Sequence, residues 1–262
     1  MQVVTVVWSF FLIVNVASTV STKKYFDLSY PFDKDTIYFP GQRQYELLKD
    51  YDNVPKEGFT YSAYSFCMGE HGGTHLDAPV HFNANGWTVD QIPLANLVDV
   101  PAVVIDVENY VNELEEPQGF AFEVAHVEAY EKSHGIIPLG SVVLVHTGWS
   151  KFWPNKVEYL GWDNITETLN FPGLSENATK MLVEERQIIG IGLDTSSVDL
   201  GSTKTFPVHV FLAQEQIFSL ENVANLRTLI EGANGCSLRL FILPLNIVGG
   251  TGAPTRILAY CQ

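Results

Sequence analysis

Residues 70–82 read EHGGTHLDAPVHF, and within this stretch lie three histidines and one aspartate: His71, His75, Asp77 and His81. Imidazole nitrogens and carboxylate oxygens are the usual protein ligands of Zn²⁺ and related divalent ions. A catalytic metal also needs a base nearby, and His81 is the candidate for that role. A single histidine most often makes only ordinary hydrogen bonds, but four such groups so close together predict a metal centre.

The glycines and the proline inside this stretch predict an extended chain rather than a helix, in which both residue types are costly. Alternate side chains of a strand share one face, so His75, Asp77 and His81 are predicted to point to the same side. Neighbours on that side lie about 6.6 Å apart, at about 3.3 Å per residue. In a straight strand His71 would lie about 13 Å from His75. We therefore expect the adjacent glycines to bend the chain and return His71 to the site.

The pattern His71-x-Gly-Thr-His75-x-Asp77-x-Pro-x-His81 resembles the signature of the cyclase family of metal-dependent hydrolases. That family includes bacterial kynurenine formamidases and isatin hydrolases. The resemblance covers nearly the whole chain after its apolar beginning, and further similar segments are residues 27–31, 39–41, 146–149, 172–175, 192–199, 244–247 and 252–256. It implies a compact single α/β domain of the swivelling β/β/α type with a mixed sheet, assembled as a homodimer or larger homo-oligomer.

The resemblance also implies a full set of metal ligands and a base. Two distant segments, Pro207-Val208-His209 and Leu220-Glu221-Asn222, match the family in order and spacing. The implied ligands of one ion are His71, His75 and Asp77, and those of a second ion are His209 and Glu221, with Asp77 bridging. His81 resembles the general acid/base. The implied cofactor is Zn²⁺ or Mn²⁺, as one or two divalent ions.

The activity implied by the family is hydrolysis of an amide C–N bond in a small molecule. The first expectation is an arylformamidase that converts N-formyl-kynurenine and water to kynurenine and formate. An alternative is the opening of a cyclic amide such as isatin. A second alternative is a non-catalytic secreted binding protein on the same fold. Such a protein is expected to lose ligands or the base first, and all six positions are present here, which favours an enzyme.

Composition limits the classes of partner. The chain has 262 residues, of which 46% are hydrophobic and 17% charged, as in an ordinary globular protein. Its formal net charge of −15 argues against nucleic acid and anionic membranes, because both require basic surfaces. The sequence also has no Gly-x-Ser-x-Gly elbow and no complete dinucleotide-binding glycine motif, so those two enzyme classes are disfavoured.

The beginning of the chain predicts secretion. Residues 3–17 are mostly apolar, no charged side chain occurs before Lys23, and small residues follow the apolar run. This run is shorter than a membrane span and is typical of a signal peptide over residues 1–20, which leaves a hydrolase domain over 21–262. A buried strand or an uncleaved anchor is the alternative. Two glycosylation sequons, at Asn164 and Asn177, agree with an extracellular protein.

Three cysteines are compatible with an oxidising compartment. Cys236 and Cys261 flank the C-terminal strand region and are candidates to pair, which would leave Cys67 over. Three buried, inert thiols are the alternative.

Periodicity and composition predict alternating strands and helices, and hence an α/β layer arrangement. Apolar runs predict strands at residues 102–105, 142–145, 188–191 and 240–243. Helices are predicted over residues 123–132 and 176–185, the latter with Ser175 as its N-cap. Four aromatic residues are candidates either for a pocket that binds a flat substrate or, as we favour, for core packing: Trp87, Trp149, Phe152 and Trp153.

Overall fold

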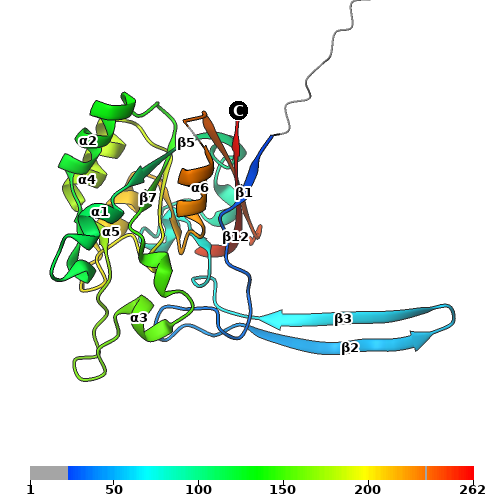
Figure 1. The fold of residues 1–262 in the computed structure, drawn as a ribbon. Helices are drawn as coiled ribbons and strands as arrows, with labels where there is room; N and C mark the ends of the chain where they lie inside the picture. Colours follow the sequence, from blue (N-terminus) through cyan, green and yellow to red (C-terminus); the bar gives the residue numbers. More distant parts are fainter. Residues whose placement is uncertain (1–22, 234) are drawn as a thin grey trace, which may run out of the picture.

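The computed structural model describes residues 23–233 and 235–262, so the predicted signal peptide lies outside the described residues. Its centre is an eight-stranded mixed sheet (Figure 1). In order across the sheet, the strands are β1 (Tyr25–Asp27), β12 (Gly252–Cys261), β11 (Leu238–Pro244), β5 (Val98–Asp106), β7 (Val142–His146), β9 (Gly190–Leu193), β10 (Phe218–Glu221) and β4 (His75–Asp77). Because β4 pairs with β12 as well as with β10, the sheet closes on itself and resembles a barrel.

The middle of this sheet is parallel and buried on both faces. The pairs β5–β7, β7–β9 and β9–β10 are parallel, and the remaining pairs are antiparallel. Strand β7 shows the consequence, since all five of its residues are buried. Val142 and Leu144 pack into the core enclosed by the sheet, whereas Val143 and Val145 pack into a second core under the helices. A continuous run of branched residues is typical of such a doubly covered strand.

The helices are α1 (Glu108–Asn112), α2 (Val124–His134), α3 (Lys156–Leu160), α4 (Glu176–Lys180), α5 (Pro207–Gln214) and α6 (Leu226–Ala233). Helices α2, α4 and α5 contribute Val127, Ala178 and Val208 to the second core and cover that face of the sheet (Figure 1). Helix α6 packs on the first core instead. In the part of the chain that the structure describes, no helix is long and apolar enough to cross a lipid bilayer.

Two small sheets complete the fold. Strands β6 (Ala121–Phe122) and β8 (Gly173–Leu174) form a short parallel pair. Strands β2 (Glu46–Lys56) and β3 (Phe59–Cys67) form a long antiparallel hairpin, which projects far from the body of the molecule (Figure 1). The resemblance did not lead us to expect this arm.

The predicted fold class is confirmed: the chain is a single α/β domain with a mixed sheet. All four predicted strands exist, although β9 begins at Gly190, two residues later than expected. The helix predicted over residues 176–185 is α4 followed by a π-helical turn, Met181–Glu185. Its predicted N-cap is also confirmed, since the Ser175 hydroxyl accepts a hydrogen bond from the Ala178 N–H.

The predicted pairing of two cysteines is confirmed as well. Cys236 and Cys261 form a disulfide that joins the chain before β11 to the end of β12. Cys67, at the end of β3, is the unpaired cysteine.

Candidate metal centre

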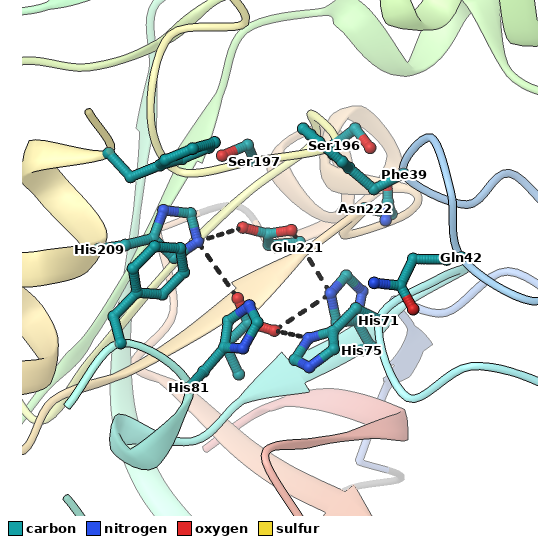
Figure 2. A pocket seen from close by; sticks show the side chains of 13 residues that line it. Phe39, Gln42, His71, His75, His81, Ser196, Ser197, His209, Glu221 and Asn222 are labelled. Carbon is teal, nitrogen blue, oxygen red and sulfur yellow. Dashed lines mark hydrogen bonds and ion pairs between the residues drawn. The ribbon is translucent and has the colours of Figure 1, made fainter. Parts of the chain in front are cut away.

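Strands β4 and β10 lie side by side and bring the first three functional side chains together. In their antiparallel register His75 lies opposite Glu221, and Asp77 lies opposite Ser219. His75 and Asp77 share one face of β4, while Leu76 between them points into the core. His75 Nε2 lies 3.2 Å from Asp77 Oδ1 and 3.4 Å from Glu221 Oε2 (Figure 2).

Helix α5 adds His209 from the opposite side of the cluster (Figure 2). His209 Nε2 lies 3.2 Å from Asp77 Oδ2 and 3.1 Å from Glu221 Oε1. The Asp199 carboxylate accepts hydrogen bonds from the backbone N–H groups of Val208 and His209, at 2.9 and 3.0 Å, and so caps the helix. The same carboxylate lies 2.7 Å from His209 Nδ1. It therefore fixes the ring so that Nε2 faces the cluster, as carboxylates behind metal-bound histidines do.

The glycine pair returns His71 to the site, as predicted. Gly73 has a φ of +57°, a conformation that glycine adopts at little cost. Gly72 lies so close to the Tyr38 ring that a Cβ atom there would be only 2.0 Å from it. The bend that results brings His71 Nδ1 to 2.6 Å from Asp77 Oδ1.

His81 reaches the site by a different route from the predicted one. Strand β4 ends at Asp77, and a 3-10 turn, Pro79–His81, follows. The prediction of one extended strand through His81 was wrong, because Pro79 begins a helical turn in which its missing N–H costs nothing. The His81 ring stacks on His71, with 3.9 Å between the ring centroids and 20° between the planes.

The cluster is buried and strongly charged. Burial lowers the pKa of His75, but the Asp77 and Glu221 carboxylates outweigh it and raise that pKa to about 9. The pKa of His209 is raised in the same way, with burial outweighed by its carboxylate neighbours. Burial raises the pKa of Asp77, but the surrounding histidines outweigh it and hold that pKa well below its usual range. Two buried carboxylates at one point require compensating positive charge.

The donor atoms fit a divalent cation. His75 Nδ1 lies 3.0 Å from the Gly73 carbonyl oxygen, so in the neutral ring Nδ1 carries the proton. His75 Nε2 is then a bare lone pair, and it is buried without a hydrogen-bond partner. Because Nε2 faces two carboxylates, it either carries a second proton, as the raised pKa of His75 indicates for the ring without an ion, or faces a cation that lies between. Three imidazole nitrogens and two carboxylates are a donor set that suits Zn²⁺ or Mn²⁺.

The geometry refines the implied division of ligands between two ions. Asp77 presents Oδ1 to His71 and His75, and Oδ2 to His209, which agrees with a bridging role. Glu221, expected on the second ion alone, also faces both sides, with Oε2 toward His75 and Oε1 toward His209. The structure thus brings all five predicted ligands together, and their role as ligands stays a prediction.

The pKa of His81 is shifted in the opposite direction from those of His75 and His209. Burial lowers the pKa of His81 to about 4; the Asp77 carboxylate opposes this, and the neighbouring histidines add to it. The ring is therefore neutral at neutral pH and is free to accept a proton.

A cavity of about 190 Å³ opens beside the cluster. Besides the histidines and carboxylates, its lining residues are Phe39, Gln42, Phe82, Ser196, Ser197, Phe206 and Asn222 (Figure 2). None of these residues was predicted from the sequence to line a pocket. The one local signal was the position of Phe82 directly after His81 and of Phe206 three residues before His209.

The four aromatic residues considered for a pocket do not line the cavity: Trp149 is buried, and the other three are half-buried and pack against apolar clusters. Trp149 is 4% exposed and packs with Phe152 and Trp153 in a third apolar cluster. Trp87 packs against the core enclosed by the sheet. The aromatic wall of the cavity is made instead by three phenylalanines, at positions 39, 82 and 206.

The chain is similar to known proteins in sequence and in fold. The Cyclase family model matches residues 26–200. An isatin hydrolase of Roseibium aggregatum is 32% identical over 201 residues, which are 73% of this chain and 72% of that protein. A kynurenine formamidase of Bacillus anthracis is 29% identical over 240 residues, which are 90% of this chain and 96% of that protein. The solved structure of isatin hydrolase A from Ralstonia solanacearum is similar with a TM-score of 0.80 and 28% identity, covering 92% of each chain.

Proposed function

The chain belongs to the cyclase family, and we propose that it is a metal-dependent hydrolase that cleaves the amide C–N bond of a small aromatic molecule. The observation that carries this proposal is the convergence of three histidines and two carboxylates in one buried cluster beside a cavity. A binding protein has no need of the neutral histidine that stands next to that cluster.

The proposed ligand atoms are Nδ1 of His71, Nε2 of His75, Nε2 of His209 and the carboxylate oxygens of Asp77 and Glu221. When bound there, one or two divalent ions would supply Lewis acidity, which makes water acidic and polarises a carbonyl group. The chain supplies rigidity, since each of the three histidines has its other ring nitrogen fixed by a hydrogen bond.

His81 is the proposed general acid/base. Its neutral ring accepts a proton from the attacking water, whose oxygen forms a bond to the amide carbonyl carbon. His81 then gives this proton to the amide nitrogen as the C–N bond breaks. The products are an amine and a carboxylic acid, which then releases its remaining proton to solvent as it ionises, and the enzyme returns to its starting protonation state.

The cavity supports a flat aromatic substrate. Phe82 and Phe206 have ring centroids 5.5 Å apart, and Phe82 also lies 4.5 Å from the His209 ring. Phe39 stands on another part of the wall. Phenylalanine rings favour an aromatic ligand, because they bury its apolar surface and pack against its ring edge-to-face or in an offset stack. N-formyl-kynurenine is our first candidate, with kynurenine and formate as products, in line with the formamidase relatives.

Isatin, a cyclic aromatic amide, is the second candidate. Two observations favour it. The chain is similar to isatin hydrolases in sequence and in structure, and the cavity is small, which suits a compact bicyclic molecule better than a longer one. Ring opening would use the same groups, except that the released nitrogen stays attached to the product.

A direct comparison of substrates tests the proposal. The purified domain is stripped of metal, reloaded with Zn²⁺ or Mn²⁺, and assayed with N-formyl-kynurenine, isatin and N-methylformamide. We expect turnover of one aromatic amide at least about 100-fold above that of the non-aromatic amide. Metal binding without turnover of either aromatic amide would contradict the proposal and favour a binding protein.

We also propose a homodimer or larger homo-oligomer. The β2–β3 hairpin supports this, because a two-stranded sheet alone in water is marginally stable. Its exposed apolar residues are Leu47, Leu48, Tyr51, Phe59, Tyr61, Tyr64 and Phe66. A second copy that covers the arm would remove these residues from water. Light scattering on the eluted protein measures the mass, and a monomer at micromolar concentration would contradict this part of the proposal.

Secretion is a further part of the proposal. The apolar residues 3–17, the Cys236–Cys261 disulfide and exposed side chains at both sequons, Asn164 and Asn177, support it. Expression in a eukaryotic cell line tests it. We expect protein in the medium with a new N-terminus near residue 21 and a mass that falls on treatment with an endoglycosidase.

A further inference from the structure

We propose that Glu70 and Thr251 are positioning residues that fix the tautomer of His71, so that its Nδ1 lone pair faces the metal centre. The inference rests on the proposed function, because it concerns the hold of the chain on a divalent ion. Neither residue lines the cavity, and neither belongs to the predicted ligand set.

A chain of short contacts leads from Glu70 to the centre. Glu70 Oε2 lies 2.6 Å from Thr251 Oγ1, and it also accepts hydrogen bonds from the backbone N–H groups of Thr251 at 3.0 Å and Gly252 at 3.3 Å. Thr251 Oγ1 in turn lies 2.9 Å from His71 Nε2. On the other side of the ring, His71 Nδ1 lies 2.6 Å from Asp77 Oδ1.

The direction of these hydrogen bonds follows from the number of protons. Two oxygens 2.6 Å apart need a proton between them, and Glu70 Oε2 already accepts from two backbone N–H groups, so it is the acceptor of this hydrogen bond as well. Thr251 therefore donates its single hydroxyl proton to Glu70. Its oxygen is then left to accept, and the group that donates to it is His71 Nε2–H. In the neutral ring the proton is thus on Nε2, and Nδ1 is the bare nitrogen.

The other two histidines of the cluster are arranged in the opposite way. His75 and His209 hold their Nδ1 atoms against the Gly73 carbonyl and the Asp199 carboxylate, and both present Nε2 to the centre. His71 presents Nδ1, so it needs a partner on Nε2. A charged acceptor makes the hydrogen bond from the Thr251 hydroxyl stronger than a neutral one would.

Close packing keeps the His71 ring in this position. A Cβ atom at Gly252 would lie 2.5 Å from His71 Cε1, so only glycine lets the start of β12 approach the ring this closely. The His81 ring, which stacks on His71 with 3.9 Å between the ring centroids, restricts the His71 ring further. The ring has little freedom to turn, and its hydrogen bond to Thr251 selects the nitrogen that carries the proton.

The test measures metal affinity and the tautomer rather than turnover. Thr251→Val removes the acceptor with little change of shape, Thr251→Ser restores a hydroxyl, and Glu70→Ala removes the charged end. Thr60→Val makes the same replacement at an exposed position of β3, in the hairpin that projects from the body of the molecule, and serves as the control. Competition with a chelator gives the Zn²⁺ affinity of each variant, and ¹⁵N NMR of labelled histidine gives the protonated nitrogen of His71.

We expect Thr251→Val and Glu70→Ala to bind Zn²⁺ about 10- to 100-fold more weakly than the wild type, the range usual for partners behind metal ligands. Thr251→Ser should return to within about threefold of the wild-type affinity, and the Nε2–H signal of His71 should be lost only in the valine and alanine variants. Equal affinity in Thr251→Val and the wild type, or an Nδ1–H tautomer of His71 in the zinc-loaded wild type, would overturn this inference alone. Absence of amide turnover with these affinities as expected would overturn only the proposed function, whereas a wild type that binds no metal would overturn both.

Discussion

His75 and Glu221 lie directly opposite each other in the antiparallel pair of β4 and β10, with 3.4 Å between Nε2 and Oε2. Strand register, rather than a flexible loop, thus brings a residue of the N-terminal motif to a residue far along the chain. A shift of either strand by one residue in this register would turn the side chains of that strand to the other face of the sheet. The position of the centre is therefore as rigid as the sheet itself.

The first prediction concerns Glu221. Glu221→Gln keeps the volume of the side chain and an acceptor for the Val198 N–H, which now lies 3.1 Å from Oε1, but it removes one of the two buried charges. We expect metal affinity to fall by more than the about 10- to 100-fold typical of a residue behind the ligands. Metal analysis after dialysis against a chelator measures this. The control is Glu215→Gln, the same replacement at an exposed position after α5, where affinity should not change.

The second prediction separates the base from the ligands. His81→Ala should retain the metal content of the wild type and lose about 10²- to 10⁴-fold in kcat, the range usual for a general acid/base. Asp77→Ala should lose both metal and activity. His134→Ala is the control, because His134 is exposed on α2 and its ring forms a hydrogen bond with the Tyr130 carbonyl of the same helix. A kcat in the His81 variant equal to that of the wild type would remove His81 from the mechanism.

Those features of the fold and the site that depend on only a few neighbouring residues could be predicted from the sequence. The glycine pair, the two ligands of β4 and the capping of α4 are all consequences of conformational preferences within a few residues, and such preferences can be derived from sequence alone. The one local prediction that failed was the extended chain at Pro79, where a helical turn begins. A proline can lie in an edge strand or at the start of a helical turn, and the sequence does not distinguish these two cases.

The contacts between residues far apart in the chain could be found only from the family resemblance or from the structure. Nothing in the neighbourhood of His209 or Glu221 marks them as ligands, and only the resemblance selected them. The closure of the sheet through β4 and β12 depends on a pairing of three residues with three, too short to leave a pattern. The contact between Glu70 and Thr251 depends on that closure, so it was not predictable from either segment.

The third prediction concerns the Asp199 carboxylate behind His209. It accepts two backbone N–H groups and lies 2.7 Å from the His209 ring, and its side chain is 2% exposed. Asp199→Asn leaves one oxygen and turns an N–H₂ group toward donors, so at least one buried donor loses its acceptor. We expect a loss of about 1–3 kcal/mol in the free energy of unfolding, measured by urea denaturation with chelator present. Metal affinity should also fall by about 10- to 100-fold.

A matched replacement checks the specificity of that effect. Asp163 also accepts a backbone hydrogen bond, from the Ile165 N–H at 2.7 Å, but it lies on an exposed turn. Asp163→Asn should change the free energy of unfolding by no more than about 0.5 kcal/mol. If both variants lost the same stability, the role of Asp199 in holding α5 and His209 would be wrong.

The last prediction concerns a buried histidine outside the centre. Burial lowers the pKa of His146, but its hydrogen bond to Asp106, with 2.9 Å between Nδ1 and Oδ1, and the nearby Asp194 and Glu108 carboxylates outweigh burial and raise that pKa above 6.5. A histidine whose pKa is higher in the folded state than in the unfolded state stabilises the fold when it is protonated. This contribution is fully present below pH 6.5 and is lost as the pH rises through the pKa of the folded state. Asp106→Asn weakens the interaction, so it should destabilise the protein more at pH 6 than at pH 9. Urea midpoints at the two pH values measure the difference, and equal destabilisation at both would show that the charge of His146 takes no part in it.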